Sequence, residues 1–171
     1  MMQRSDNLIL AGMPGAGKST VGVILAKMTS RGFTDTDLLI QTSQKRTLQD
    51  IVDTDGYAAL REIEEKVLTG LFVENHVIAT GGSAVYSDPA MLHLKSLGIV
   101  IFLEADLPTL ESRIHNFGTR GLAKRPDQNF ADLYHERSGL YAKYADITIR
   151  CTGRTQEQVC ADIIEQTDMK S

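Results

Sequence analysis

The chain has 171 residues, of which 42% are hydrophobic, 23% charged and 6% aromatic. A chain of this length fits one domain with a sizeable core, and its composition excludes a disordered or fibrous protein. The net charge is −4 with 18 Lys and Arg residues spread along the chain, and no apolar run approaches the ~20 residues of a membrane span, so neither nucleic acid nor membrane is an expected partner.

Short apolar runs alternate with segments of helical spacing along the whole chain. Strands are predicted at 8–11, at a run ending near 33, and at 76–80, 99–103 and 147–149. Helices are predicted at 18–28, in pieces over 38–71 with a turn at 53–56, and at 89–97, 108–116, 130–142 and 155–166, the last with Thr155 as its N-cap. This alternation predicts a single α/β domain over 1–171, with a doubly wound parallel sheet of about five strands and helices on both faces.

Two other features bear on the cellular compartment and on the redox state of the cysteines. The first residues, MMQRSDNLILAG, contain too short an apolar run for a signal peptide, so the protein is expected to be cytoplasmic. The only cysteines, Cys151 and Cys160, fall in a predicted strand end and a predicted helix. We therefore expect reduced, structural thiols rather than a disulfide.

The stretch GMPGAGKST, residues 12–20, satisfies the phosphate-loop pattern GxxxxGK[ST] between an apolar strand and a helix. Its glycines let backbone N–H groups surround phosphate oxygens, and the positive end of the following helix faces the same anion. Lys18 adds a mobile positive charge, and Ser19 offers a hydroxyl to Mg²⁺. A chance glycine-rich turn is the alternative, which the strand–loop–helix context disfavours. The predicted nucleotide-binding residues of the loop are Gly15, Ala16, Gly17, Lys18, Ser19 and Thr20.

Switches, motors, transporters and small kinases all use such a loop. A chain of 171 residues leaves no room for a motor or transporter apparatus. It also lacks an NKxD-like tetrapeptide, with which a GTPase switch would read guanine. A small-molecule kinase is therefore the expected class.

Two further polar motifs follow predicted strands, DTD at 35–37 and GGS at 81–83. Ligands of a parallel sheet collect at the carboxyl ends of its strands, so both motifs are expected to face the phosphate loop. Asp35 could hold a Mg²⁺-bound water, while Asp37 could orient or deprotonate a substrate hydroxyl for attack on the γ-phosphate. The alternative for this motif is a helix N-cap, where Asp is favoured.

Two arginines are candidate ligands of an acidic substrate, Arg61 in ALREIEEKVL and Arg137 in YHERSGLY. A guanidinium supplies two parallel donors that match a carboxylate. The alternative for each is an exposed surface arginine, and Glu64 could hold Arg61 in a solvated ion pair.

Taken in order, these motifs resemble those of the shikimate kinase family, which has the nucleoside-monophosphate-kinase-like P-loop fold. GMPGAGKST resembles the family's P-loop, FTDTDLLI its DTD segment, DGYAALREIEE its arginine-bearing helix, TGGSAV its glycine turn, GTRGLA its lid, and RSGLYAKYAD its R-x-P-L-Y-x-x-x-A-D element. The resemblance covers nearly the whole chain. It implies a three-layer fold with a mobile lid over about 117–129.

The resemblance also assigns roles. It implies that shikimate contacts Asp37, Arg61, Gly81, Gly82 and Arg137. It implies that Arg120 contacts ATP phosphates, that Ser19 binds Mg²⁺, and that Arg113 and the loop around Arg154 enclose adenine. Lys18, Asp37 and Arg120 would then be the catalytic residues, with Ser19 and Asp35 at the metal.

Several positions depart from the family pattern. Ser83 replaces the third glycine of the glycine turn, and prolines are replaced by Gly121 in the lid and by Gly139 in the R-x-P-L-Y element. Val52, Tyr57 and Leu60 stand where the family has Phe, Glu and Phe beside the substrate arginine. Gly121 is expected to make the lid more flexible, and a changed apolar wall alters discrimination by only about 1–3 kcal/mol.

The expected function is ATP-dependent phosphorylation of shikimate to shikimate 3-phosphate, in aromatic amino-acid biosynthesis, by a monomer. One alternative is a kinase of the same fold that acts on another acceptor, such as gluconate or a nucleoside monophosphate. The other is a non-catalytic nucleotide-binding module.

Overall fold

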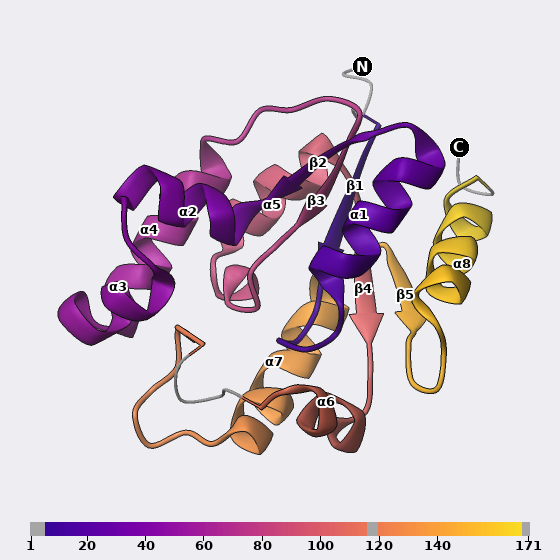
Figure 1. Ribbon diagram of the computed structural model, residues 1–171. Coiled ribbons are helices and arrows are strands. Elements are labelled where there is room, and N and C mark those ends of the chain that lie inside the picture. Colours follow the sequence, from indigo (N-terminus) through magenta and orange to yellow (C-terminus); the bar gives the residue numbers. More distant parts are fainter. Residues whose placement is uncertain (1–5, 116–119, 169–171) are drawn as a thin grey trace.

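The computed structural model describes residues 6–115 and 120–168. Strands and helices alternate along these residues (Figure 1). In chain order the elements are β1 (Asn7–Ala11), α1 (Lys18–Thr29), β2 (Gly32–Asp35), α2 (Thr36–Gln44), α3 (Leu48–Asp55), α4 (Tyr57–Thr69), β3 (His76–Ala79), the 3₁₀ turn η1 (Ala84–Tyr86), α5 (Asp88–Leu97), β4 (Gly98–Glu104), α6 (Leu107–Arg113), α7 (Phe130–Tyr144), β5 (Ile147–Arg150) and α8 (Gln156–Asp168).

The strands form one five-stranded parallel sheet in the order β2-β3-β1-β4-β5. The central strand β1 is buried along its whole length, and its Leu8 pairs with Val77 on one side and Ile99 on the other. The strand arrowheads point to the same edge of the sheet in Figure 1, so the loops after the strands gather there. The predicted strand sites and parallel sheet are confirmed.

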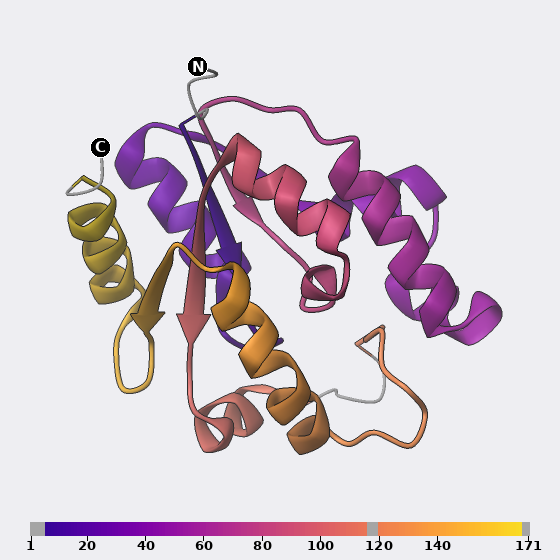
Figure 2. The same ribbon diagram turned by 180° about the vertical axis from the view of Figure 1, so that it is seen from behind.

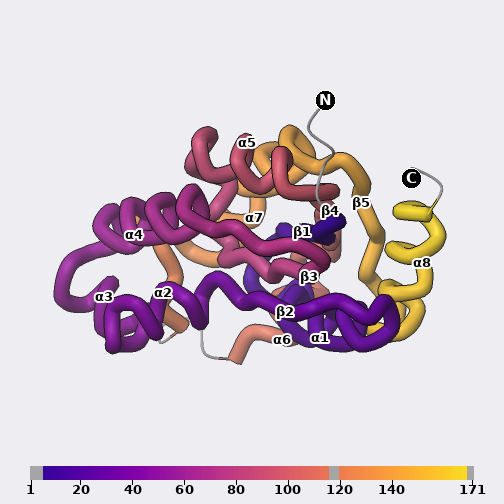
Figure 3. Tube along the Cα trace, turned by 90° about the horizontal axis from the view of Figure 1, so that it is seen from above, coloured from indigo at the N-terminus to yellow at the C-terminus, as the bar shows by residue number. Residues whose placement is uncertain are grey.

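Helices cover both faces of the sheet, as predicted. Figures 1 and 3 show α1 and α8 against one face, and Figure 2 shows α5 and α7 against the other. This double covering explains why the inner strands are continuous apolar runs rather than alternating ones.

The helices α2, α3 and α4 extend to the side of the sheet where β2 lies (Figure 3). They pack around a small apolar cluster of their own, formed by Ile40, Ile51, Leu60 and Ala123. Ala123 belongs to the segment between α6 and α7, and its neighbour Leu122 packs against the main core, so this part of the segment contacts both clusters.

Side-chain caps account for several helix starts. The Asp35 carboxylate accepts the backbone N–H of Leu38 at 3.2 Å at the start of α2. Thr155 is confirmed as the cap of α8, because its Oγ1 accepts the N–H of Gln158 at 3.2 Å. The predicted turn at 53–56 is only partly right, since 53–55 complete α3 and the chain breaks at Gly56. A second break, at Lys45 with φ 55°, was not predicted.

Two remaining predictions concern cysteines and membranes. Cys151 and Cys160 are buried free thiols. In the described ranges 6–115 and 120–168, no helix is long and apolar enough to cross a membrane. The predicted helix end at 116 and the first residues of the predicted lid, 117–119, lie outside the described residues.

Candidate active site

A cavity of about 390 Å³ lies at the carboxyl edge of the sheet. It is bounded by the phosphate loop, α2, α4, the glycine turn after β3, the segment after α6, and α7. The predicted site residues that line it are Gly15, Gly17, Lys18, Ser19, Thr20, Asp37, Gly81, Gly82, Arg113, Arg120 and Arg137. The predicted residues that do not line it are Ala16, Asp35, Arg61 and Arg154.

Lys18 begins α1 directly after Gly17, whose left-handed backbone (φ 93°) turns the loop into the helix. Its Nζ donates hydrogen bonds to the carbonyl oxygens of Gly12 at 2.5 Å and Met13 at 3.0 Å. Burial lowers the pKa of Lys18 to about 8, although the nearby Asp37 carboxylate acts in the opposite direction. The Lys18 ammonium is therefore held inside the loop, near the Asp37 carboxylate.

Ser19 and Asp35 meet beside the loop. The Ser19 hydroxyl donates to Oδ2 of Asp35 at 2.8 Å, while Oδ1 of the same carboxylate caps α2. Asp35 therefore caps α2, as the alternative interpretation of the DTD motif predicted, and it also bonds Ser19. A hydroxyl and a carboxylate oxygen are protein ligands of the kind that Mg²⁺ takes beside phosphates and water.

Asp37 and Glu64 converge on the glycine turn. A β-carbon on Gly81 would lie 2.5 Å from Oδ1 of Asp37 and 2.6 Å from Oε2 of Glu64. Burial raises the pKa of Asp37, with the Lys18 charge acting against it. Only a residue without a side chain fits between the two carboxylates at this point, which explains the glycine.

Glu64 is a site residue that sequence reasoning missed. The prediction that it could hold Arg61 in a solvated pair is wrong, because Glu64 is only 3% exposed and accepts the Ser83 hydroxyl at 2.5 Å. Burial raises its pKa to about 7, and the neighbouring Asp37 adds to this. The available signal was spacing, since Glu64 lies four residues from both Leu60 and Leu68, the other buried residues of α4.

Arg137 is buried in α7, with 1% of its surface exposed. Its Nε donates to the Tyr86 hydroxyl at 3.2 Å and its Nη2 to the carbonyl oxygen of Ala123 at 3.1 Å. A β-carbon on Gly82 would lie 2.7 Å from its Nη1. The second glycine of the turn therefore makes room for this guanidinium, just as the first does for the carboxylates.

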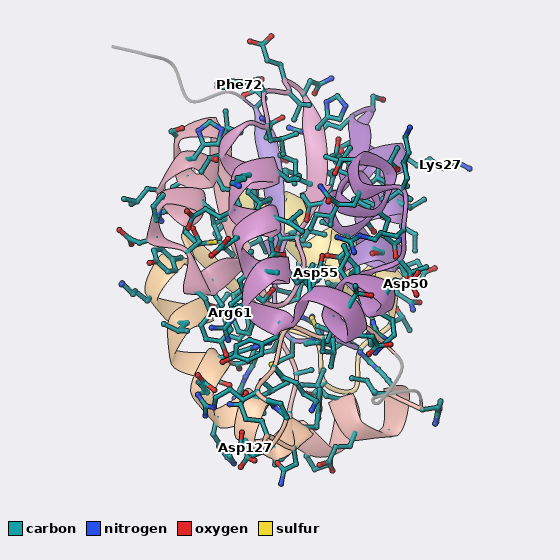
Figure 4. The ribbon with its side chains drawn as sticks, turned by 90° about the vertical axis from the view of Figure 1, so that its left-hand side faces the viewer. Lys27, Asp50, Asp55, Arg61, Phe72 and Asp127 are labelled. Carbon is teal, nitrogen blue, oxygen red and sulfur yellow. The ribbon has the colours of Figure 1, made fainter. Side chains whose placement is uncertain are left out.

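Arg61 is oriented by aromatic rings rather than by Glu64. Its guanidinium carbon lies 3.7 Å from the ring centre of Tyr86 and 5.4 Å from that of Tyr57. Figure 4 shows Arg61 on α4, on the side that faces α7. Both predicted substrate arginines thus meet at Tyr86, a residue that the sequence analysis did not single out.

The other predicted arginines divide into two groups. Arg113 and Arg120 line the cavity, and Arg113 donates to the carbonyl oxygen of Gly15 at 3.3 Å. Arg154 instead forms an ion pair with Asp162, whereas Gln156, two residues further along, lines the cavity.

The family departures are distributed unevenly. Of the three altered wall residues, Leu60 lines the main cavity, whereas Val52 and Tyr57 line a neighbouring cavity of about 280 Å³. Gly121 has φ 69°, and its N–H donates to Oε1 of Gln49 at 2.7 Å. A β-carbon on Gly121 would lie 2.6 Å from the backbone nitrogen of Gln49. Gly121 thus allows a close contact with α3 that the flexibility argument did not foresee.

A model of the family described as Shikimate kinase matches residues 14–168. The chain belongs to the shikimate kinase family. It is 37% identical to the shikimate kinase of Rippkaea orientalis, with 93% of this chain and 86% of that protein covered. It is also 37% identical to the shikimate kinase of Lactococcus lactis, with 94% and 97% covered.

Solved structures give the same result. The shikimate kinase of Acinetobacter baumannii in complex with shikimate superposes with a TM-score of 0.88 at 30% identity, covering 98% of this chain and 95% of that one. The thymidylate kinase of Candida albicans superposes with a TM-score of 0.54 at 15% identity, covering 98% and 92%, which shows a shared fold alone. The predicted α/β P-loop fold is confirmed.

Proposed function

We propose that this chain transfers the γ-phosphoryl group of ATP to the 3-hydroxyl of shikimate. One observation carries the proposal: a single cavity is lined by the phosphate loop with Lys18, by the half-buried carboxyl group of Asp37 and by the buried guanidinium of Arg137. These groups suit a polyphosphate, a hydroxyl and a carboxylate, respectively. Shikimate carries its carboxylate at the end opposite the phosphorylated hydroxyl.

The donor side of the cavity suits ATP with Mg²⁺. Lys18 would exchange its two loop carbonyls for phosphate oxygens, because an ammonium bonds an anion more strongly than a neutral carbonyl. The Ser19 and Asp35 oxygens would hold Mg²⁺ directly or through water. When bound, the ion would offset charge on the phosphates. Arg113 and Arg120 line the same cavity and complete the positive surroundings.

Asp37 is the proposed general base. It would accept the proton of the attacking hydroxyl while the oxygen–phosphorus bond forms and the bond from the γ-phosphorus to the ADP oxygen breaks. Because burial raises its pKa, Asp37 is a stronger base than an exposed aspartate. Lys18 stabilises its anion and the transferring phosphoryl group together.

Arg61 and Arg137 are the proposed carboxylate ligands, and the 117–129 segment is the proposed lid. Arg137 already bonds Ala123 of this segment, and Gly121 of the segment bonds α3. Closure over the donor would exclude water, which otherwise hydrolyses ATP. That the chain is one kinase domain acting as a cytoplasmic monomer is part of the same proposal.

The test is an ADP-release assay with a panel of acceptors: shikimate, gluconate and a nucleoside monophosphate, each with and without Mg²⁺. We expect turnover with shikimate that requires Mg²⁺ and exceeds turnover with either other acceptor. Preference for gluconate or a nucleotide would reassign the acceptor. ATP binding without turnover on any of the three would support a non-catalytic nucleotide-binding module instead.

A further inference from the structure

Tyr86 lies between the two arginines of the acid-binding side. The Arg61 guanidinium carbon lies 3.7 Å from the centre of its ring, and that of Arg137 lies 5.2 Å away. Nε of Arg137 also donates to the Tyr86 hydroxyl at 3.2 Å. One side chain from η1 therefore contacts cations from α4 and α7, two helices far apart in the sequence.

Two guanidinium groups so placed repel each other, and Tyr86 reduces that repulsion in two ways. The electron-rich face of the ring attracts the stacked Arg61 cation. The phenol oxygen accepts a hydrogen bond from Arg137.

Stacking orients Arg61 without using its hydrogen-bond donors. Nε of Arg61 is buried and has no hydrogen-bond partner among the residues described, 6–115 and 120–168. A guanidinium that is stacked through its face keeps its in-plane N–H groups for a carboxylate. A buried donor without a partner carries a cost until such a ligand arrives.

The position of Tyr86 is itself tied to the phosphoryl-acceptor side. Its N–H donates to the carbonyl oxygen of Ser83 at 3.1 Å, and Ser83 bonds Glu64. Ala84 and Val85, which precede it, are buried in the main core. The ring therefore stands at a fixed place relative to the glycine turn and to Asp37 beside it.

We propose that Tyr86 is a positioning residue that holds Arg61 and Arg137 as a paired site for one carboxylate. It thereby makes the enzyme selective for acceptors that carry a carboxylate over neutral analogues of the same shape. This inference rests on the proposed function, because it assumes that the acceptor is an acid such as shikimate.

The experiment compares Tyr86→Leu and Tyr86→Phe with the unmodified chain, using shikimate and its neutral carboxamide as acceptors. Tyr86→Leu removes both contacts and should raise KM for shikimate roughly tenfold. Tyr86→Phe keeps the ring and should raise it only about threefold. KM for ATP should stay within about twofold in both variants, and the preference for shikimate over the carboxamide should fall in the same order.

Two controls separate positioning from general damage. Phe72→Leu removes an aromatic ring that is 76% exposed and lies far from Arg61 in Figure 4, and it should change neither KM. In an Arg61→Ala background, Tyr86→Leu should add less to KM than it does alone, because one of the cations that it positions is gone.

The outcomes are distinguishable. If the unmodified chain does not phosphorylate shikimate, the proposed function fails, and this inference falls with it. If it does, but Tyr86→Leu leaves KM for shikimate unchanged, only the role of Tyr86 is refuted. Equal rises in KM for shikimate, carboxamide and ATP, with a lower Tm, would show a structural role and would also refute it.

Discussion

The two sides of the cavity are built differently. The donor side centres on one contiguous loop between β1 and α1, anchored in the main core of the sheet, with Asp35, Arg113 and Arg120 around it. The acceptor side is assembled from α2, α4, η1, α7 and the segment after α6, and part of it rests on the separate small cluster around Ile40 and Leu60. A contiguous loop can be identified from its sequence alone, whereas the acceptor side exists only after distant elements have packed.

The two sides also differ in how closely they follow the expected family pattern. Within the phosphate loop the pattern GxxxxGK[ST] is intact. The departures from the family pattern at Leu60, Ser83 and Gly121 all line the acceptor side. Ser83 brings a contact that glycine cannot make, its hydrogen bond to Glu64. Three of the six expected departures therefore line this cavity, whereas Val52 and Tyr57 line the neighbouring one.

The largest expected effect comes from Asp37→Asn, which alters the acceptor side at its closest approach to the donor side. We expect kcat to fall about 10²–10⁴-fold, the usual contribution of a general base. KM for ATP should stay nearly constant. Because Asn carries no buried charge, the free energy of unfolding should not decrease. A fall in kcat below tenfold, measured by ADP release, would remove Asp37 from proton transfer.

Glu64→Gln tests the cost of the buried carboxyl group. The folded-state pKa of Glu64 is about 7, against 4.5 for the free side chain. Between pH 4.5 and about pH 7, Glu64 is protonated in the folded protein but ionised in the unfolded chain. Stability from this group is therefore complete below pH 4.5 and is lost as the pH rises through 7. The total loss is on the order of 3 kcal/mol.

The measurement is urea unfolding of both proteins at pH 5, 6, 7 and 8. Wild-type stability should fall relative to that of Glu64→Gln as the pH rises, because Gln does not titrate but can still accept the Ser83 hydrogen bond. Asp37 titrates in both proteins, so the difference between them isolates Glu64 to a first approximation. Parallel curves for the two proteins would contradict the raised pKa.

Arg61→Ala and Arg137→Lys test the acid-binding arginines. Loss of a charge-assisted hydrogen bond costs about 1.5–3 kcal/mol, or roughly 10–150-fold in KM for shikimate. KM for ATP should change far less. Lys is chosen at the buried position 137 because it keeps the charge but loses the forked donors. Equal effects on both substrates would place these arginines outside the acceptor site.

The element types, the parallel sheet and the phosphate loop could be predicted because each has a local pattern. Glu64 looked like an exposed helix charge, and only its four-residue spacing from Leu60 and Leu68 placed it on the buried face. Tyr86 has no such signal, because its role arises only where α4 and α7 both pack against η1. Arg154 was assigned by resemblance alone and stays a prediction, because the structure shows only that it pairs with Asp162 and does not line the cavity.

Gln49→Ala should have the smallest effect, and it tests whether the 120–129 segment acts as a lid. Oε1 of Gln49 accepts the Gly121 N–H, and its Nε2 donates to Asp53 on the exposed side of α3. Losing the first bond should raise the activation free energy for shikimate by about 0.5–1.5 kcal/mol, which lowers kcat/KM roughly two- to twelvefold. Asp53→Ala removes only the second bond and is the matched control, expected to leave kcat/KM unchanged.

If Gln49→Ala and Asp53→Ala lower kcat/KM equally, the effect comes from α3 itself rather than from docking of the segment. If Gln49→Ala alone lowers it and also raises ATP hydrolysis without acceptor, the contact between α3 and Gly121 helps to exclude water during transfer.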